Sequence, residues 1–211
     1  MRMSEKIYPI GIQNFEKIRK EGYFYIDKTA LIYRLVKTGS YYFLSRPRRF
    51  GKSLLISTLD AYFRGEKELF KGLAIEKLEK DWVQRPVLHI DLNIGKYDAP
   101  DSLDKILNEA LVKWESVFGT GAGESTLALR FKGVVERAYK QSGQRVAILV
   151  DEYDKPLLQA IGNEELQREY RNTLKPFYGV LKTMDGCIQF AMLTGVTKFG
   201  KVSVFSDLNN L

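Results

Sequence analysis

The chain has 211 residues, of which 45% are hydrophobic and 28% charged, and its formal net charge is +7. This composition is typical of one soluble globular domain and excludes collagen-like, coiled-coil and wholly disordered chains. No apolar run reaches the roughly 18 to 20 residues of a membrane span, and a single cysteine excludes a disulfide within the chain. We therefore expect a cytoplasmic protein without a membrane segment.

The basic surplus lies in the N-terminal part of the chain. Residues 1–85 contain 18 basic and 10 acidic residues, a surplus of eight, whereas residues 86–211 contain 15 and 16, a deficit of one. A basic surplus is typical of proteins that bind nucleic acid or another polyanion.

The first half of the chain alternates short helices with aromatic segments. Hydrophobic spacing and turn residues predict helices over 14–21, 28–37 and 51–63, a β-prone stretch at 23–26 and a buried strand over 41–44. Asp27 is expected to cap the second helix and Gly39 to end it.

The second half shows a more regular alternation. We predict strands over 86–91, 146–150 and 187–194 and helices over 101–118, 125–141 and 164–182. The apolar, β-branched run 146–150 is expected to be buried on both faces. The alternation predicts an α/β fold of three layers with a mainly parallel central sheet, in which functional loops lie at the carboxyl ends of the strands.

The loop at 45–53 carries the strongest functional motif. It follows a predicted strand, opens a predicted helix and ends in Gly51, Lys52 and Ser53. In this context backbone N–H groups cradle phosphate, the lysine reaches the β- and γ-phosphates, and the serine hydroxyl binds Mg²⁺. The full P-loop pattern has a glycine where this chain has Arg46.

An acidic pair follows the most apolar predicted strand. Asp151 is in the position of an aspartate that holds Mg²⁺ through water, and Glu152 in that of a general base that polarises the attacking water. The two motifs occur in the order and context that a nucleoside-triphosphate site requires.

Other polar residues of these strands and loops are open to several interpretations. Arg46, Arg48 and Arg49 could contact phosphate, contact a nucleic-acid backbone, or pair with Asp154 and other acids. Asp91 and Asp154 could contact the metal shell or stabilise loops, and we expect the second role. His89 lies in an apolar strand and is expected to be a core histidine with satisfied nitrogen atoms.

Four segments together resemble the bacterial and archaeal AAA-ATPase-like proteins over nearly the whole chain. The segments are 25–29, 46–53, 150–156 and 193–199. The resemblance implies a P-loop NTPase of the additional-strand, catalytic-glutamate class, with a loop variant that lacks the first glycine. It also implies a nucleotide-binding loop made of Pro47, Arg48, Arg49, Phe50, Gly51, Lys52, Ser53 and Leu54.

The resemblance implies further roles and a domain organisation. Thr194 would end a strand between the loop strand and the acidic strand and act there as a polar sensor of the γ-phosphate. Residues 1–38 would lead into the nucleotide site, with 25–29 over the adenine. Many members continue into a PD-(D/E)xK nuclease-like domain, so we expect 1–211 to be an ATPase module truncated near 207–211, with the C-terminal effector domain absent.

The sequence thus predicts a Mg²⁺-dependent ATP-binding protein and ATPase that hydrolyses the β–γ bond, releases ADP and gates a conformational change. Lys52, Glu152 and Thr194 are the expected catalytic residues, and Ser53 and Asp151 the expected metal ligands. One alternative is a nucleotide-gated binding module with little turnover. Another is a nucleic-acid-binding component of a nuclease-linked ATPase. A second copy of the chain or nucleic acid could stimulate hydrolysis.

Overall fold

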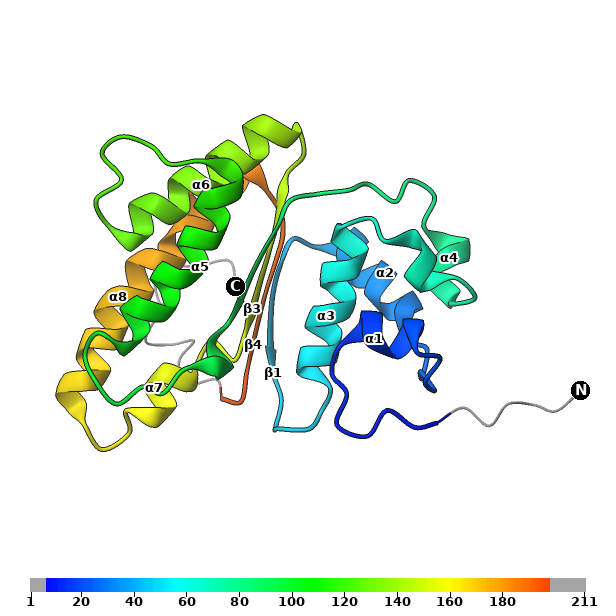
Figure 1. The fold of residues 1–211 in the computed structure, drawn as a ribbon, viewed down its shortest axis with the longest axis horizontal. Coiled ribbons are helices and arrows are strands. Elements are labelled where there is room, and N and C mark those ends of the chain that lie inside the picture. The colour runs from blue at the N-terminus through cyan, green and yellow to red at the C-terminus, as the bar shows by residue number, and fades with distance from the viewer. Residues whose placement is uncertain (1–6, 198–211) are drawn as a thin grey trace, which may run out of the picture.

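A four-stranded, all-parallel sheet forms the centre of the molecule (Figure 1). The structure is a computed structural model that describes residues 7–197. The strand order is β1-β4-β3-β2, with β1 at Tyr41–Ser45, β2 at Val87–Asp91, β3 at Val146–Asp151 and β4 at Ile188–Gly195. The predicted α/β class is confirmed, and the fold is consistent with that of a P-loop NTPase.

Two layers of helices cover the sheet (Figure 1). One face carries α1 (Phe15–Lys20), α2 (Thr29–Thr38), α3 (Lys52–Phe63) and α4 (Ala74–Leu78). The other carries α5 (Ser102–Phe118), α6 (Leu127–Ser142) and α8 (Glu164–Thr183), while α7 (Lys155–Gln159) lies near the carboxyl ends of the strands. Short 3₁₀ turns occur at η1 (Lys67–Phe70), η2 (Leu92–Ile94) and η3 (Asp185–Cys187).

Strand β3 is buried on both faces, as its unbroken apolar sequence predicts. Val146, Ile148 and Val150 belong to the core under α5, α6 and α8. The alternate residues Ala147 and Leu149 belong to the core under α1 to α4. Because side chains alternate across a strand, this one segment separates two hydrophobic cores and fixes the three-layer arrangement.

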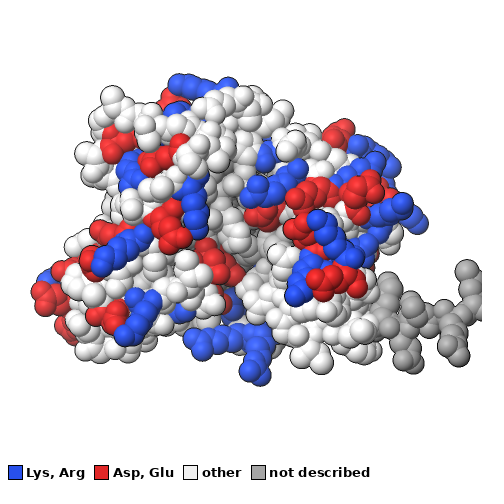
Figure 2. Space-filling view, viewed as in Figure 1, with Lys and Arg blue, Asp and Glu red and all other residues white. Residues whose placement is uncertain are grey.

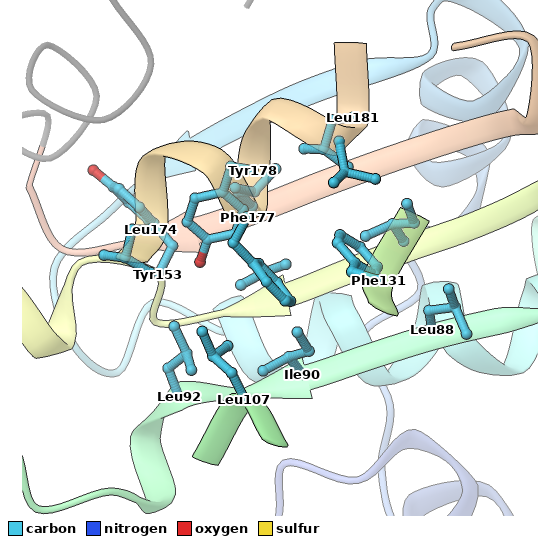
Figure 3. Packing of buried hydrophobic residues seen from close by; sticks show 14 of the residues in the cluster. Leu88, Ile90, Leu92, Leu107, Phe131, Tyr153, Leu174, Phe177, Tyr178 and Leu181 are labelled. Atoms are coloured by element: carbon cyan, nitrogen blue, oxygen red, sulfur yellow. The ribbon is translucent and has the colours of Figure 1, made fainter. Parts of the chain in front are cut away.

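Aromatic stacking organises the core beneath the long helices (Figure 3). Phe131 of α6 lies parallel to Phe177 of α8, with ring centroids 4.5 Å apart, and Trp114 of α5 also stacks on Phe131. All three side chains are buried. The buried residues of α5, which are Leu103, Leu107, Leu111 and Trp114, recur at helical spacing on one face.

The opposite layer is held by hydrogen bonds between side chains and backbone. Contrary to the prediction from the sequence, the N-cap of α2 is Lys28 and not Asp27, but Asp27 accepts the Thr29 N–H at 2.8 Å and its second oxygen accepts the Ala74 N–H at 2.7 Å. The buried Thr29 hydroxyl accepts the Ile75 N–H at 3.1 Å. Asp27 and Thr29 therefore join the start of α2 to the start of α4.

Several expectations about the elements are wrong. Strand β1, one of the two edge strands of the described sheet, is half-exposed rather than buried. Residues 23–26 form no strand: they run beside α1 without a ladder partner. The sequence does not predict the short helices α4 and α7, since five residues are too few to show a helical period.

Some features fall at or beyond the limits of the described chain. Lys198 and Phe199 of the fourth motif and the expected module end at 207–211 lie outside the described residues. Within residues 7–197, no helix has the combination of length and apolar composition needed to cross a bilayer.

Candidate functional site

The loop between β1 and α3, which the sequence predicts to bind phosphate, turns directly into the start of α3. The Arg46 N–H donates to the Gly195 carbonyl at 3.0 Å, which continues the β1–β4 ladder by one residue. Gly51 then adopts φ +76° directly before α3 begins at Lys52. A Cβ at Gly51 would meet no atom within 4 Å, so glycine is required here by backbone conformation and not by space.

Arg46 occupies the position of the missing first glycine without strain. The non-glycine residues with positive φ in the described chain are Arg49, Trp82 and Glu152, and Arg46 is not among them. Arg49 instead takes φ +68°, a left-handed conformation that costs an L-residue roughly 1–2 kcal/mol. The loop thus turns at Arg49 and Gly51, and an arginine is compatible with its first position.

Lys52 is buried and held by three oxygen atoms. Its side chain is 3% exposed, and its Nζ donates to the carbonyls of Arg46 at 3.0 Å and Pro47 at 3.3 Å. The third oxygen is Glu152 Oε1, at 3.1 Å. A buried ammonium requires such compensation, and the loop carbonyls aim the lysine across the mouth of the loop toward the end of β3.

Glu152 stands at a strained turn after β3. Its φ is +55°, a conformation that non-glycine residues rarely adopt. The Glu152 N–H donates to the Thr194 hydroxyl at 3.3 Å, and the Tyr153 N–H donates to the Thr194 carbonyl at 2.8 Å. These contacts with β4 hold the turn that directs the Glu152 carboxylate toward Lys52.

Thr194 links the two acidic residues. It is buried in β4, which lies between β1 and β3 as expected. Its hydroxyl donates to Asp151 Oδ1 while accepting the Glu152 N–H. Asp151, Glu152, Thr194 and Lys52 therefore form one continuous set of contacts at the carboxyl edge of the sheet.

A cavity of about 870 Å³ opens in front of Lys52 and Glu152. Its lining includes Arg48, Arg49, Lys52, Glu152 and Lys155, so that four cations face one carboxylate. Figure 2 shows Lys and Arg side chains projecting at the bottom of the view, where Figure 1 draws the loop between β1 and α3. The cavity is therefore suited to an anionic ligand.

The two predicted metal ligands share a second, adjoining cavity. Ser53 and Asp151 both line a space of about 390 Å³, and Ser53 also lines the larger cavity. No group of three or more His, Cys, Asp or Glu residues able to hold a metal ion occurs in residues 7–197. Mg²⁺ in nucleotide sites uses one or two protein oxygens together with phosphate and water, and Ser53 and Asp151 fit that requirement.

An apolar cavity of about 520 Å³ adjoins the loop between β1 and α3. Tyr25, Ile26 and Lys28 line it together with Phe24 and Phe50. Two residues of the loop, Gly51 and Leu54, line both this cavity and the cationic one. The residues of segment 25–29 thus have two roles. Asp27 and Thr29 join α2 to α4, while Tyr25, Ile26 and Lys28 line this cavity.

Asp154 does not pair with the loop arginines, which corrects one of the three interpretations. Its buried carboxylate accepts the N–H groups of Val196, at 3.0 Å, and Thr197, at 2.7 Å, and the Thr197 hydroxyl at 2.9 Å. It stabilises the segment after β4, as expected. The exposed Arg48 and Arg49 form no ion pair within residues 7–197, so phosphate and nucleic acid remain as their candidate ligands.

His89 is not the satisfied core residue that was expected. Its side chain is 33% exposed, Nδ1 lies 3.4 Å from Asp60 Oδ2, and Nε2 has no hydrogen-bond partner within the described structure. Burial alone raises the pKa of Asp60, but hydrogen bonds from His89 and Arg64 outweigh burial and leave that pKa below its ordinary value.

Sequence reasoning missed residues that line the cationic cavity from the side facing the loop. Asn93, Lys155 and Gln159 belong to η2 and α7, and residues 10–13 close the cavity from the N-terminal segment. A signal existed for two of them, because Asn93 and Lys155 lie within four residues of the acidic ends of β2 and β3. No comparable signal marks residues 10–13.

The α/β fold with its all-parallel sheet is consistent with the P-loop NTPase class, and comparison with known proteins gives the family of the chain. The model of the AAA-ATPase-like family, described as predicted AAA-ATPase, matches residues 9–205, and the chain belongs to this family. A curated relative from Azotobacter chroococcum mcd 1, described as an uncharacterized protein in the vnfD 5' region, is 44% identical over 211 residues. The alignment covers 99% of this chain and 41% of that relative. No solved structure matches the chain.

Proposed function

We propose that the protein binds ATP with Mg²⁺ and hydrolyses its β–γ bond to drive or gate a conformational change. The observation that carries this proposal is the 3.1 Å contact between Lys52 at the start of α3 and Glu152 at the end of β3. In this contact the Lys52 ammonium, proposed to bind phosphate, lies next to the carboxylate of Glu152, the proposed general base.

In the proposed complex, the N–H groups of the loop 47–54 and the Lys52 ammonium bind the phosphates. A phosphate group would compete with Glu152 for Lys52, because both are anions that seek the same buried ammonium. Nucleotide binding would thereby release the Glu152 carboxylate. Membership of an ATPase family supports nucleotide binding at this loop.

Ser53 and Asp151 would hold Mg²⁺. The ion, when bound, neutralises phosphate charge. The Asp151 carboxylate is prepared for this by the hydrogen bond from Thr194, which fixes the orientation of one of its oxygens. We propose Thr194 as the γ-phosphate sensor because its hydroxyl joins Asp151 to the Glu152 backbone.

In the hydrolytic step, Glu152 takes a proton from water as the water oxygen bonds to the γ-phosphorus. The bond between that phosphorus and the β–γ bridging oxygen breaks, and ADP and inorganic phosphate leave. The loop N–H groups and Lys52 stabilise the charge that shifts to the leaving oxygens. Glu152 is thus the proposed general base, and Lys52 the proposed electrostatic catalyst.

The adenine would occupy the apolar cavity beside the loop. Gly51 and Leu54 line both cavities, so a nucleotide bound through its phosphates can reach from one cavity to the other. Tyr25, Phe24 and Phe50 offer aromatic surface to a purine. This placement supports residues 1–38 as the lead-in to the nucleotide site.

Two variants test the proposal. Wild type should show an ATP- and ADP-dependent rise in melting temperature with Mg²⁺, and Lys52→Ala should lose it. Glu152→Gln should keep that shift while phosphate release falls by about 10²–10⁴-fold, the usual contribution of a general base. The proposal is wrong if wild type shows no nucleotide-dependent shift, and Glu152 has no catalytic role if its variant turns over at the wild-type rate.

A binding module with little turnover is the second candidate, and the Lys52–Glu152 ion pair favours it. A carboxylate that is 15% exposed and already paired does not activate water until the pair opens. Tight ATP binding with phosphate release near zero would select this function.

A role in nucleic-acid binding is favoured by the exposed, unpaired Arg48 and Arg49 on the described surface. Salt-dependent binding to DNA that persists in Lys52→Ala would support it, because that variant removes the phosphate-loop cation while leaving both arginines.

A further inference from the structure

The cationic cavity has a second fixed cation, on the wall that faces the phosphate loop. Lys155, the first residue of α7, lines the same cavity as Lys52. Its ammonium donates to Asn93 Oδ1 at 2.9 Å and to the Asn93 carbonyl. No carboxylate lies within ion-pair distance of Lys155 in the described structure, so its charge is not neutralised by a side chain.

A series of hydrogen bonds that starts at the end of β2 holds Lys155 in place. Asp91, which lies beside Asp151 in the sheet, accepts the Asn93 N–H at 2.8 Å. That bond fixes η2, and η2 presents both oxygens of Asn93 to Lys155. An ammonium has three N–H donors, and Asn93 takes two of them. One donor is left for a ligand in the cavity.

The backbone places Lys155 close to the proposed catalytic base. The Lys155 N–H donates to the Glu152 carbonyl at 3.0 Å, so one tight turn connects the carboxylate to the lysine. Arg48 and Arg49 also line the cavity, but both are exposed on the loop and have no fixed side-chain partner among the described residues. Lys155 is therefore held in position before a ligand binds, whereas Arg48 and Arg49 are not. A charge that is already in position is the more effective one in catalysis.

We propose that Lys155 contacts the γ-phosphate of the bound nucleotide from the wall opposite Lys52 and stabilises the charge of the transferring phosphoryl group. This inference rests on the proposed function. It goes beyond that function because it gives the terminal phosphate a second cation from the same chain, in addition to Lys52. Asn93 and Asp91 are its positioning residues. ADP has no terminal phosphate at this place, so Lys155 distinguishes ATP from ADP.

The test compares ADP with a non-hydrolysable ATP analogue, with Mg²⁺ present and the chain as it stands. Lys155→Met keeps most of the aliphatic stem and removes the charge. We expect the dissociation constant for ADP to stay within about twofold, that for the analogue to rise about tenfold, and phosphate release to fall at least tenfold. Lys155→Arg should recover part of both losses, because it restores a cation.

Two further variants separate this role from a structural one. Asn93→Ala leaves Lys155 in place but removes one of its two oxygen partners, so the analogue should bind less tightly while ADP binding is kept. Lys96→Met is the matched control: Lys96 is also in the region after β2, but its side chain is 85% exposed and paired with Asp98. It should leave both nucleotides and turnover unchanged.

The outcomes distinguish this inference from the function on which it rests. If wild type binds nucleotide and Lys155→Met keeps the wild-type ratio of ADP to analogue affinity, the role of Lys155 is refuted and the ATP site stands. An equal loss for both nucleotides also refutes it, since a γ-phosphate contact cannot weaken ADP. If wild type binds neither nucleotide, the proposed function itself fails.

Discussion

The two helical layers of this protein are built differently, and the difference separates scaffold from site. The layer of α5, α6 and α8 consists of helices of 16 to 20 residues over one large core. The layer of α1 to α4 consists of helices of 5 to 12 residues, and all three cavities of the site border it or its loops. Regular packing thus supports the sheet from one side, while irregular structure on the other side leaves room for a ligand.

The contacts that hold each layer differ in the same way. In the long-helix layer, ion pairs such as Arg130–Glu115 and Arg137–Glu124 join side chain to side chain. The short-helix layer also has an ion pair, Lys37–Glu79, but side chains there satisfy backbone groups as well: the Ser57 hydroxyl accepts the Phe15 N–H at 2.8 Å, and Arg19 donates to the Leu69 carbonyl at 2.7 Å. Short helices have many unsatisfied end groups, which explains this use of polar side chains.

Removing an aromatic side chain from the scaffold should have the largest effect. Phe177→Ala deletes a buried ring that stacks on Phe131, and we expect a loss of about 3–5 kcal/mol in the free energy of unfolding. Urea unfolding measures this loss. The folded fraction should bind ATP with wild-type affinity, and a large fall in that affinity would contradict the separation of scaffold from site.

Glu79 tests the polar connections of the other layer. This buried carboxylate accepts from Tyr62, the backbone N–H groups of Lys80 and Asp81, and pairs with Lys37 at 3.0 Å. Glu79→Gln keeps the shape but removes the charge, and we expect a loss of about 2–3 kcal/mol in the free energy of unfolding. A change within 0.5 kcal/mol, the range of ordinary surface substitutions, would show that these bonds do not hold the layer.

The same residue predicts a pH dependence. Burial raises the pKa of Glu79, but its hydrogen bonds with Tyr62 and Lys37 outweigh burial and leave that pKa below its ordinary value. Its stabilising contribution is therefore present above the unfolded pKa of about 4.3 and is lost as pH falls through the lower, folded value. The difference in unfolding free energy between wild type and Glu79→Gln should shrink from pH 7 toward pH 4 and below. A difference independent of pH would contradict the assignment.

A matched pair of glycines should give the smallest effect on stability and the clearest separation of function. Gly51 in the phosphate loop and Gly143 after α6 have φ of +76° and +65°, and an added Cβ would meet no atom within 4 Å at either. Replacing either by alanine should cost about 1 kcal/mol of stability, from backbone strain alone. Gly51→Ala should also weaken ATP binding, whereas Gly143→Ala should not. Equal binding by both variants would contradict the role of the loop.

The two layers also differ in how far the sequence predicts them. Helices α5, α6 and α8 repeat apolar residues over several turns, so their limits were predicted within two residues. The helices α4 and α7 form because of tertiary contacts, such as those of Asp27 and Thr29 with α4, that join residues more than 40 positions apart. No local pattern encodes such contacts.

The two parts of the candidate site also differ in how far the sequence predicts them. Gly51, Lys52, Asp151, Glu152 and Thr194 lie at or after the carboxyl ends of strands, so the topology of a parallel sheet predicts that they converge, and the structure brings them together. Their catalytic and binding roles stay predictions until tested. The facing wall of Asn93 and Lys155 depends on how η2 and α7 pack against each other, which spacing in the sequence does not specify.

The left-handed backbone of Glu152 bears on how this protein could be engineered. At φ +55° a glycine or asparagine would relieve strain that glutamate imposes. A screen that rewards heat resistance alone would therefore favour replacement at this position and discard the carboxylate on which the proposed hydrolysis depends. Variant libraries made to stabilise this protein should therefore keep Glu152, or should be screened for turnover and heat resistance together.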